Sequence, residues 1–320
     1  MKIIIWGYPL YSHTHSYIHE GFYRAFKYLG YETYWFHDGD YPSDFDWNDC
    51  VFFTEGFAEK NIPLNKSCIY LVHCTCNPKK YLEINPKRYI DVRYNHVWMK
   101  DHIYNYTLDK KNVQKVGNAC YFTNRENKSI LYKNDYHEYY IEDYDKFYIS
   151  WATNLLPYEI NFDDISHPRK NEIWFCGSIV ADIRWENYSV YKPFIEECQK
   201  LNIPFHINNP FQNPLTNDEV IKRTKDSLIG IDLRGPEHLR NGYLPCRIMK
   251  NISYGHLGIT NSNEAYNELD GNCLYEKDPV EILYKALDKK TDYDFIKKSM
   301  VYVKENHTYI NRIKSLMSII

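Results

Sequence analysis

The sequence predicts an α/β fold made of two successive domains, each built on a doubly wound parallel sheet. A chain of 320 residues exceeds the size of one ordinary hydrophobic core. Short runs of β-branched and aromatic residues alternate along it with segments of helical period. A polar stretch at residues 161–170 interrupts this alternation before it starts again. We therefore expect domains at 1–160 and 171–294, followed by a helix at 295–320.

The first half opens on a buried strand, because Ile3, Ile4 and Ile5 are consecutive β-branched residues. A helix follows, with apolar residues at helical spacing up to Leu29 and with Gly30 as its C-cap. Further strands are expected at 32–36, 49–53, 68–73, 89–94 and 119–123. A strand, a helix, a glycine and a second strand in this order are typical of the start of a doubly wound sheet.

The same alternation returns after residue 170. Strands are expected at 172–177, 205–207, 228–233 and 257–260. Helices are expected at 191–201, 216–227, 245–254 and 279–287. Thr216 and Glu219 have the spacing of a capping box at the start of the second of these helices. Because ligands of such sheets bind beyond the carboxyl ends of the strands, we expect a cleft between the two domains.

Composition narrows the class of protein. The net charge is -3, which does not favour bulk binding to nucleic acid or to an anionic membrane, so no nucleic-acid partner is expected. The nine cysteines have no repeated spacing and indicate reduced thiols, as in a cytoplasmic protein. The apolar run at the N-terminus is too short for a signal or transmembrane segment, and no later run reaches about 18 apolar residues.

One short segment has a pattern that a metal site could use. His73, Cys74 and Cys76 lie close together in the sequence, but no second ligand pair follows at zinc-site spacing. They also end an apolar strand, which favours buried packing. No metal site and no cofactor are therefore expected.

The segment 242–261 carries the strongest functional pattern. It contains a loop, a helix that begins near Arg247, a glycine at Gly255 and a strand. The N-terminus of a helix carries a partial positive charge, so a cation in its first turn works against the helix dipole. Such a cation is favoured where an anion is bound. The alternative interpretation is an ordinary surface arginine.

This segment resembles the donor-site helix of GT-B glycosyltransferases, and most closely the group-1 branch that includes the spore-maturation type. The similarity lies in Arg247, the pair Tyr254-Gly255 and Thr260. The C-terminal run His307-Thr308-Tyr309 with Arg312 resembles the terminal motif of the same family, and Phe175-Cys176-Gly177-Ser178 resembles the start of its donor domain. The resemblance covers residues 172–312, and the first 150 residues match in architecture alone.

The resemblance implies a nucleotide-diphosphate sugar donor, of the UDP or GDP type. Arg247 would hold the diphosphate, the backbone at Gly177 and Ser178 would approach it, and Arg184 would supply a second cation. Two arginines can stabilise the charge of the leaving group without a metal. The resemblance also implies that helix 295–320 packs back on the first domain.

The sequence departs from the family at one position. Lys250 stands where the family has a glutamate that binds the ribose hydroxyls. This departure puts the nucleoside contacts in doubt. Asn251, Ser253 and Glu237 are the remaining candidates for contacts with the nucleotide.

The first domain offers candidates for the catalytic base. An inverting transfer needs a group that removes the proton of the acceptor hydroxyl, and histidine titrates near neutral pH. His13 and His15 follow the first strand, and Glu55 ends the third. Glu20 and Asp91 are further candidates, while a retaining reaction would need no such base. Each histidine is also compatible with an ordinary polar loop.

These patterns together predict a metal-independent glycosyltransferase of the hexosyl or pentosyl class. It would move a sugar from the nucleotide donor to a hydroxyl acceptor, such as a glycan. One alternative is a nucleotide-sugar epimerase or hydrolase of the same fold, although few carboxylates lie near the donor loop. The other is a non-catalytic structural protein that retains the fold, which Lys250 keeps open.

Overall fold

The computed structural model divides the chain into two compact units. Unit 1 comprises Met1–Ser150 together with Ile310–Ile320, and unit 2 comprises Trp151–Tyr309. The polar segment 161–170 therefore lies inside unit 2. The structure describes residues 1–73, 78–93, 113–116, 119–122, 130–133, 138–141, 145–181, 186–240 and 242–320.

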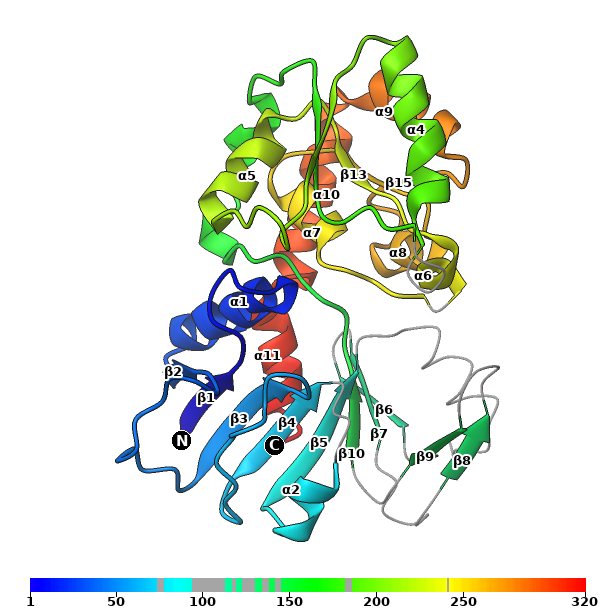
Figure 1. Ribbon diagram of the computed structural model, residues 1–320. Helices are drawn as coiled ribbons and strands as arrows, with labels where there is room; N and C mark the ends of the chain where they lie inside the picture. Colours follow the sequence, from blue (N-terminus) through cyan, green and yellow to red (C-terminus); the bar gives the residue numbers. More distant parts are fainter. Residues whose placement is uncertain are drawn as a thin grey trace. The chain divides into compact units, whose positions relative to one another are not determined.

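Unit 1 is built on an eight-stranded sheet with the strand order β2-β1-β3-β4-β5-β10-β7-β6 (Figure 1). The strands from β2 to β10 in this order pair in parallel. The last two pairs of the sheet, β10 with β7 and β7 with β6, are antiparallel. A separate hairpin joins β8 and β9. The strands are β1 (Lys2–Trp6), β2 (Glu32–Phe36), β3 (Cys50–Glu55), β4 (Ile69–His73), β5 (Arg88–Arg93), β6 (Val113–Val116), β7 (Ala119–Phe122), β8 (Ile130–Lys133), β9 (Glu138–Ile141) and β10 (Asp145–Tyr148).

The central strands of this sheet are apolar along their length because both faces are covered. Every residue of β3 and β4 is buried, as a parallel sheet between helices requires. Helix α1 (Thr14–Tyr28) packs Phe22, Ala25 and Phe26 inward, and the short helix α2 (Lys79–Glu83) buries Tyr81.

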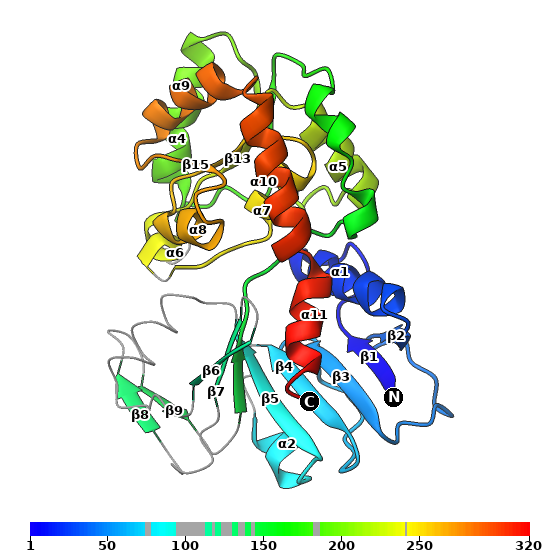
Figure 2. The same cartoon turned by 180° about the vertical axis from the view of Figure 1, so that it is seen from behind.

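The end of the chain completes unit 1. Helix α11 (Tyr309–Met317) buries Ile313 and Leu316, and Figure 2 shows it lying against the sheet near β3 and β4. Arg312 is 1% exposed, and it donates hydrogen bonds to the carbonyl and hydroxyl oxygens of Ser150 at 2.9 and 2.7 Å. The expected helix at 295–320 is therefore two helices, and residues 310–320 belong to unit 1.

Unit 2 contains two small parallel sheets, β11-β12 and β13-β14-β15, with helices around them. Its strands are β11 (Ile173–Cys176), β12 (Phe205–Asn208), β13 (Gly230–Asp232), β14 (Gly258–Thr260) and β15 (Leu274–Tyr275). Its helices are the 3₁₀ turns η2 (Pro157–Glu159) and η3 (Phe162–Ser166), and α4 (Tyr188–Lys200), α5 (Asn217–Asp226), α6 (Pro236–Arg240), α7 (Arg247–Ser253), α8 (Asn263–Glu268), α9 (Pro279–Lys289) and α10 (Tyr293–Asn306).

A single apolar cluster holds unit 2 together. It joins strand residues such as Phe175 and Ile259 to Ile248 and Ile252 of α7 and to Met300 of α10. The predicted α/β class with parallel sheets is confirmed in both units. No helix among the described residues is long and apolar enough to cross a membrane.

Candidate functional site

Arg247 begins α7 and lies at the carboxyl end of β11. Its guanidinium stacks 4.4 Å from the centre of the Phe175 ring, and its Nε donates to the carbonyl oxygen of Cys176 at 3.3 Å. Its side chain is 22% exposed. The predicted anion-binding arginine is therefore held in a fixed orientation while part of it remains accessible to a ligand.

A buried carboxylate connects Arg247 to a second arginine. Asp232 ends β13 and is fully buried, and Arg247 Nη1 lies 3.4 Å from its Oδ1. Arg234 forms a two-point ion pair with the same carboxylate, with its Nε 3.2 Å from Oδ2 and its Nη2 on Oδ1. Two guanidinium groups share one carboxylate, so this group carries an excess of one positive charge.

The positive charge acts on the neighbouring side chains. Burial, and then the charge of Arg234, lower the pKa of His238 on α6 to about 4, so this imidazole is neutral at pH 7. Burial raises the pKa of the Cys176 thiol, against the opposing effect of Arg247. The net charge of the site therefore comes from the two arginines.

Gly177 makes room for the Arg247 guanidinium. A Cβ atom at residue 177 would overlap Arg247 Nη2 and lie 2.9 Å from the Phe175 ring. The Gly177 amide donates to the carbonyl oxygen of Asn208 at 2.9 Å and so extends the sheet. The Ser178 hydroxyl donates to Asn209 Oδ1 at 3.1 Å. The structure thus brings Gly177 and Arg247 together, with Ser178 beside them in the chain.

The other predicted nucleotide contacts lie elsewhere in unit 2. Asn251 is buried, and its Nδ2 donates to the carbonyl oxygen of Ile231, which ties α7 to β13. Ser253 is buried and shares a hydrogen bond of 2.7 Å with the hydroxyl of Thr153. These two side chains therefore make packing contacts within unit 2, and their contact with a nucleotide stays a prediction.

Two further candidates remain. Glu237 on α6 forms an ion pair of 2.6 Å with Arg240. Arg184 lies outside the described residues.

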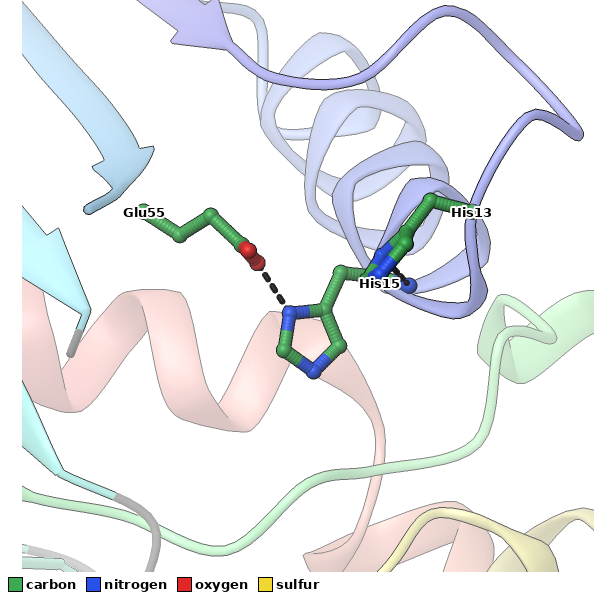
Figure 3. A group of neighbouring side chains, drawn as sticks. All are labelled: His13, His15 and Glu55. Atoms are coloured by element: carbon green, nitrogen blue, oxygen red, sulfur yellow. Dashed lines mark hydrogen bonds and ion pairs between the residues drawn. The ribbon is translucent and has the colours of Figure 1, made fainter. Parts of the chain in front are cut away.

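Unit 1 brings the three predicted catalytic residues together at the carboxyl edge of its sheet. His13 is the N-cap of α1, with its Nδ1 accepting from the backbone N–H of His15 at 3.2 Å. Glu55 is the last residue of β3, and its Oε2 contacts Nδ1 of His15. Figure 3 shows the carboxylate pointing toward the His15 ring. Because the carboxylate accepts from Nδ1–H, the lone pair of the neutral ring is on Nε2.

Burial controls the protonation of this group. Burial raises the pKa of Glu55, but the hydrogen bond from His15 and the nearby imidazoles outweigh it, so the pKa stays below its ordinary value. Burial lowers the pKa of His13 and lowers that of the fully buried His19 to about 4. Burial, together with the charge of Glu55, raises the pKa of Tyr8 to about 12. Burial therefore favours the neutral forms of His13, His19 and Tyr8 around the ionised Glu55.

The remaining candidates surround this group or lie apart from it. His73 ends β4 with its ring centre 5.7 Å from that of His15, and its Nδ1 donates to the carbonyl oxygen of Val92. Glu20 lies on α1, and Asp91 is buried in β5. Among the described residues, the group of His13, His15 and Glu55 combines the base candidates most closely.

Sequence patterns alone missed Arg234 and its pairing with Asp232. The signal was present, because Asp232 lies near the end of the predicted strand 228–233 and Arg234 is the first residue after that strand. Charged residues that follow a parallel strand lie at the edge where ligands of such sheets bind.

Comparisons with known proteins identify solved structures with a similar fold. No protein-family model matches the chain, and no curated protein matches it in sequence. Two solved structures resemble it, both of an alpha-glucosyltransferase in complex with UDP and a 13-mer DNA containing an HMU base. The TM-score is 0.53 for both, with 10% identity over 99% of each chain for one structure. The second shares 12% identity over 100% of this chain and 98% of its own.

These neighbours confirm a glycosyltransferase fold but do not support the spore-maturation branch. They also overturn one prediction, the exclusion of nucleic acid as a partner, because the alpha-glucosyltransferase is in complex with DNA in both structures. The exclusion rested on the net charge of the whole chain, which says little about the charge of one local surface. The neighbours give no support to a glycan as the acceptor.

Proposed function

We propose that this chain is a glycosyltransferase that moves a sugar, most simply a hexose, from a UDP- or GDP-type donor to a hydroxyl acceptor. The observation that carries the proposal is the group of Asp232, Arg234 and Arg247 beside Gly177 in unit 2. Its uncompensated positive charge suits the diphosphate of the donor. The glycosyltransferase fold of the solved neighbours supports the same assignment.

The proposed chemistry at the donor follows from charge. Breaking the bond between sugar and phosphate leaves additional negative charge on the diphosphate. Arg247, oriented by Phe175 and Cys176, would donate hydrogen bonds to it, and Arg234 would hold Asp232 so that Arg247 keeps its position. We propose that the positive charge of Arg247 takes the place of a metal ion at the diphosphate.

The proposed chemistry at the acceptor uses unit 1. His15 would take the acceptor proton on Nε2, while Glu55 holds Nδ1–H and stabilises the imidazolium that forms. In this proposal unit 2 binds the donor, and unit 1 supplies the base that acts on the acceptor. Hydroxyl groups carried by DNA belong among the acceptors to test, because the structural neighbours hold DNA with an HMU base.

The donor site is tested by nucleotide binding. Replacing Arg247→Ala is expected to weaken binding of UDP or GDP, measured by titration calorimetry, by about 10- to 100-fold, because a charge-assisted hydrogen bond contributes about 1.5–3 kcal/mol. Arg223→Ala is the matched control. Arg223 stacks 4.5 Å from the centre of the Trp174 ring, which is next to Phe175 on β11, but Arg223 is not part of the Asp232 group. Equal affinity in wild type and Arg247→Ala would refute the donor site.

The acceptor site is tested by turnover in buffer that contains a chelator. His15→Gln is expected to lower kcat by about 10²- to 10⁴-fold, the usual contribution of a general base, while donor affinity stays unchanged. Nucleotide release that requires an added acceptor identifies transfer, and release without one identifies hydrolysis. A kcat within about threefold of wild type would remove His15 from the reaction.

A further inference from the structure

The group of His13, His15 and Glu55 has the donor atoms of a metal site. One ligand atom from each residue lies within 4.8 Å of the other two. The backbone brings them together, because His13 is in the extended conformation while His15 is already helical, so their rings meet edge to face at 5.2 Å between centres. Glu55 reaches the same point from the adjacent strand β3, which pairs with β1.

Glu55 is the observation that points to a ligand. It is 1% exposed, one carboxylate oxygen contacts His15, and the other oxygen, Oε1, is buried without a hydrogen-bond partner among the described residues. The nearby Tyr8 hydroxyl, whose pKa the carboxylate helps to raise, is an uncharged neighbour. A buried carboxylate costs free energy unless hydrogen bonds or a cation satisfy both oxygens. Within the described part of the chain, the ion pairs of Glu55 include His15 but no lysine or arginine. Among the residues that the structure describes, no fixed positive charge therefore neutralises this carboxylate.

We infer that His13, His15 and Glu55 bind a divalent transition-metal ion of the zinc type. Two imidazoles and one carboxylate are a ligand set that zinc uses in proteins, with a fourth position left for water. Magnesium and calcium prefer oxygen ligands throughout, so two imidazole nitrogens select against them. The ion would replace the proton between His15 and Glu55 and neutralise the buried carboxylate, so the metal-bound form and the form in which His15 acts as a base are alternative states of this site.

The spacing of the donor atoms allows this with a small movement. Ligand atoms around a tetrahedral zinc ion lie about 3.4 Å apart, given bonds of about 2.0–2.1 Å. The observed limit of 4.8 Å is larger. His13 and His15 are only partly buried, so their side chains can rotate. A rotation that moves the ring nitrogens by about an ångström would bring the three ligand atoms to the separation that zinc requires.

Metal binding to the chelator-treated full-length chain tests the inference without donor or acceptor, so its outcome is independent of the proposed transfer. Titration calorimetry with Zn²⁺ is expected to show one site per chain. His13→Gln, His15→Gln and Glu55→Gln should each weaken it at least tenfold while far-ultraviolet circular dichroism stays unchanged. His37→Gln, a histidine outside the group in the same unit, should bind as wild type does.

Cobalt identifies the ligands. Co²⁺ in the site is expected to give visible d–d bands without the charge-transfer band of a thiolate. Absence of Zn²⁺ binding in the wild type, or wild-type affinity in all three variants, would overturn the inference. So would binding that is lost in the double variant Cys74→Ser/Cys76→Ser but kept in His15→Gln, because that result assigns the ion to the cysteines.

Discussion

In the candidate donor site, the charged side chains differ in burial and in the number of their contacts. Asp232 is fully buried and serves two guanidiniums, whereas Arg247 has one weak ion pair, one carbonyl partner and an aromatic ring. Burial fixes Asp232 and Arg234, whereas the side chain of Arg247 remains partly exposed. The same division is present in unit 1, where Glu55 is buried and His15 is 26% exposed on its side chain. In both places a buried carboxylate orients a more accessible group.

Buried histidines predict how stability depends on pH. Burial, and then the charge of Arg169, lower the pKa of His256 to about 3, and its Nε2–H donates to the carbonyl oxygen of Thr224. The folded-state pKa lies below the unfolded value of 6.5, so below that pH only the unfolded state gains the proton. Stability is therefore present above about pH 6.5 and is lost as the pH falls toward the folded pKa.

His256→Gln removes this proton uptake. Wild type is expected to lose about 1.4 kcal/mol more per pH unit than the variant between pH 6 and pH 4, in urea unfolding followed by circular dichroism. His206→Gln serves as the control in the same unit, because the His206 side chain is 38% exposed. Parallel pH profiles for wild type and His256→Gln would contradict the burial of a neutral imidazole.

At the scale of the element, the ends of helices are where sequence and structure agree best. Thr216 and Glu219 form the predicted capping box of α5, with the Thr216 hydroxyl accepting from the Glu219 amide at 3.3 Å and the Glu219 carboxylate accepting from the Thr216 amide at 2.8 Å. Gly30 and Gly255 have the positive φ of helix-ending glycines, at 84° and 88°. Local chemistry determines these ends, so short sequence patterns find them.

Gly255 has a second constraint that the sequence does not reveal. A Cβ atom at this position would lie 2.6 Å from the carbonyl oxygen of Asp164. Gly255→Ala is therefore expected to cost more than about 2 kcal/mol of unfolding free energy, since the clash adds to about 1–2 kcal/mol of backbone strain. Urea unfolding of the purified variant measures this loss.

Gly271→Ala is the matched control in the same unit. Its φ is +72°, and a Cβ atom there would meet only the end of the Tyr266 side chain, at 3.3 Å. We expect this variant to show the strain of about 1–2 kcal/mol alone. Equal losses in the two variants would mean that the contact between Gly255 and Asp164 is unimportant for stability.

At the scale of the whole molecule, the chain passes between its two units twice. It leaves unit 1 after Ser150 and returns at Ile310. The last residues are required inside unit 1, because Ile313, Leu316 and Arg312 are buried there and Arg312 bonds to Ser150. Residues at the two ends of the sequence thus complete one core.

The comparison with solved structures also belongs to this scale. The structural similarity extends over 99% of this chain at 10% sequence identity. The two proteins therefore share a fold although their sequences have little in common. Fold depends on the order and spacing of apolar segments, which many sequences satisfy, whereas the acceptor depends on a few surface residues. This explains why the fold class could be predicted from the sequence, whereas the prediction that excluded nucleic acid as a partner was wrong.

The sequence by itself was enough to predict most helices and strands and to single out Arg247. Consecutive β-branched residues identified the buried strands, and the position of Arg247 at the start of a helix predicted an anion site, because both signals are local. Tertiary structure alone decided which side chains meet. His15 and Glu55 are 40 positions apart, and Arg247 and Asp232 are 15 apart. No local pattern encodes such pairs, because the pairing of parallel strands brings their carboxyl ends together only in the folded sheet.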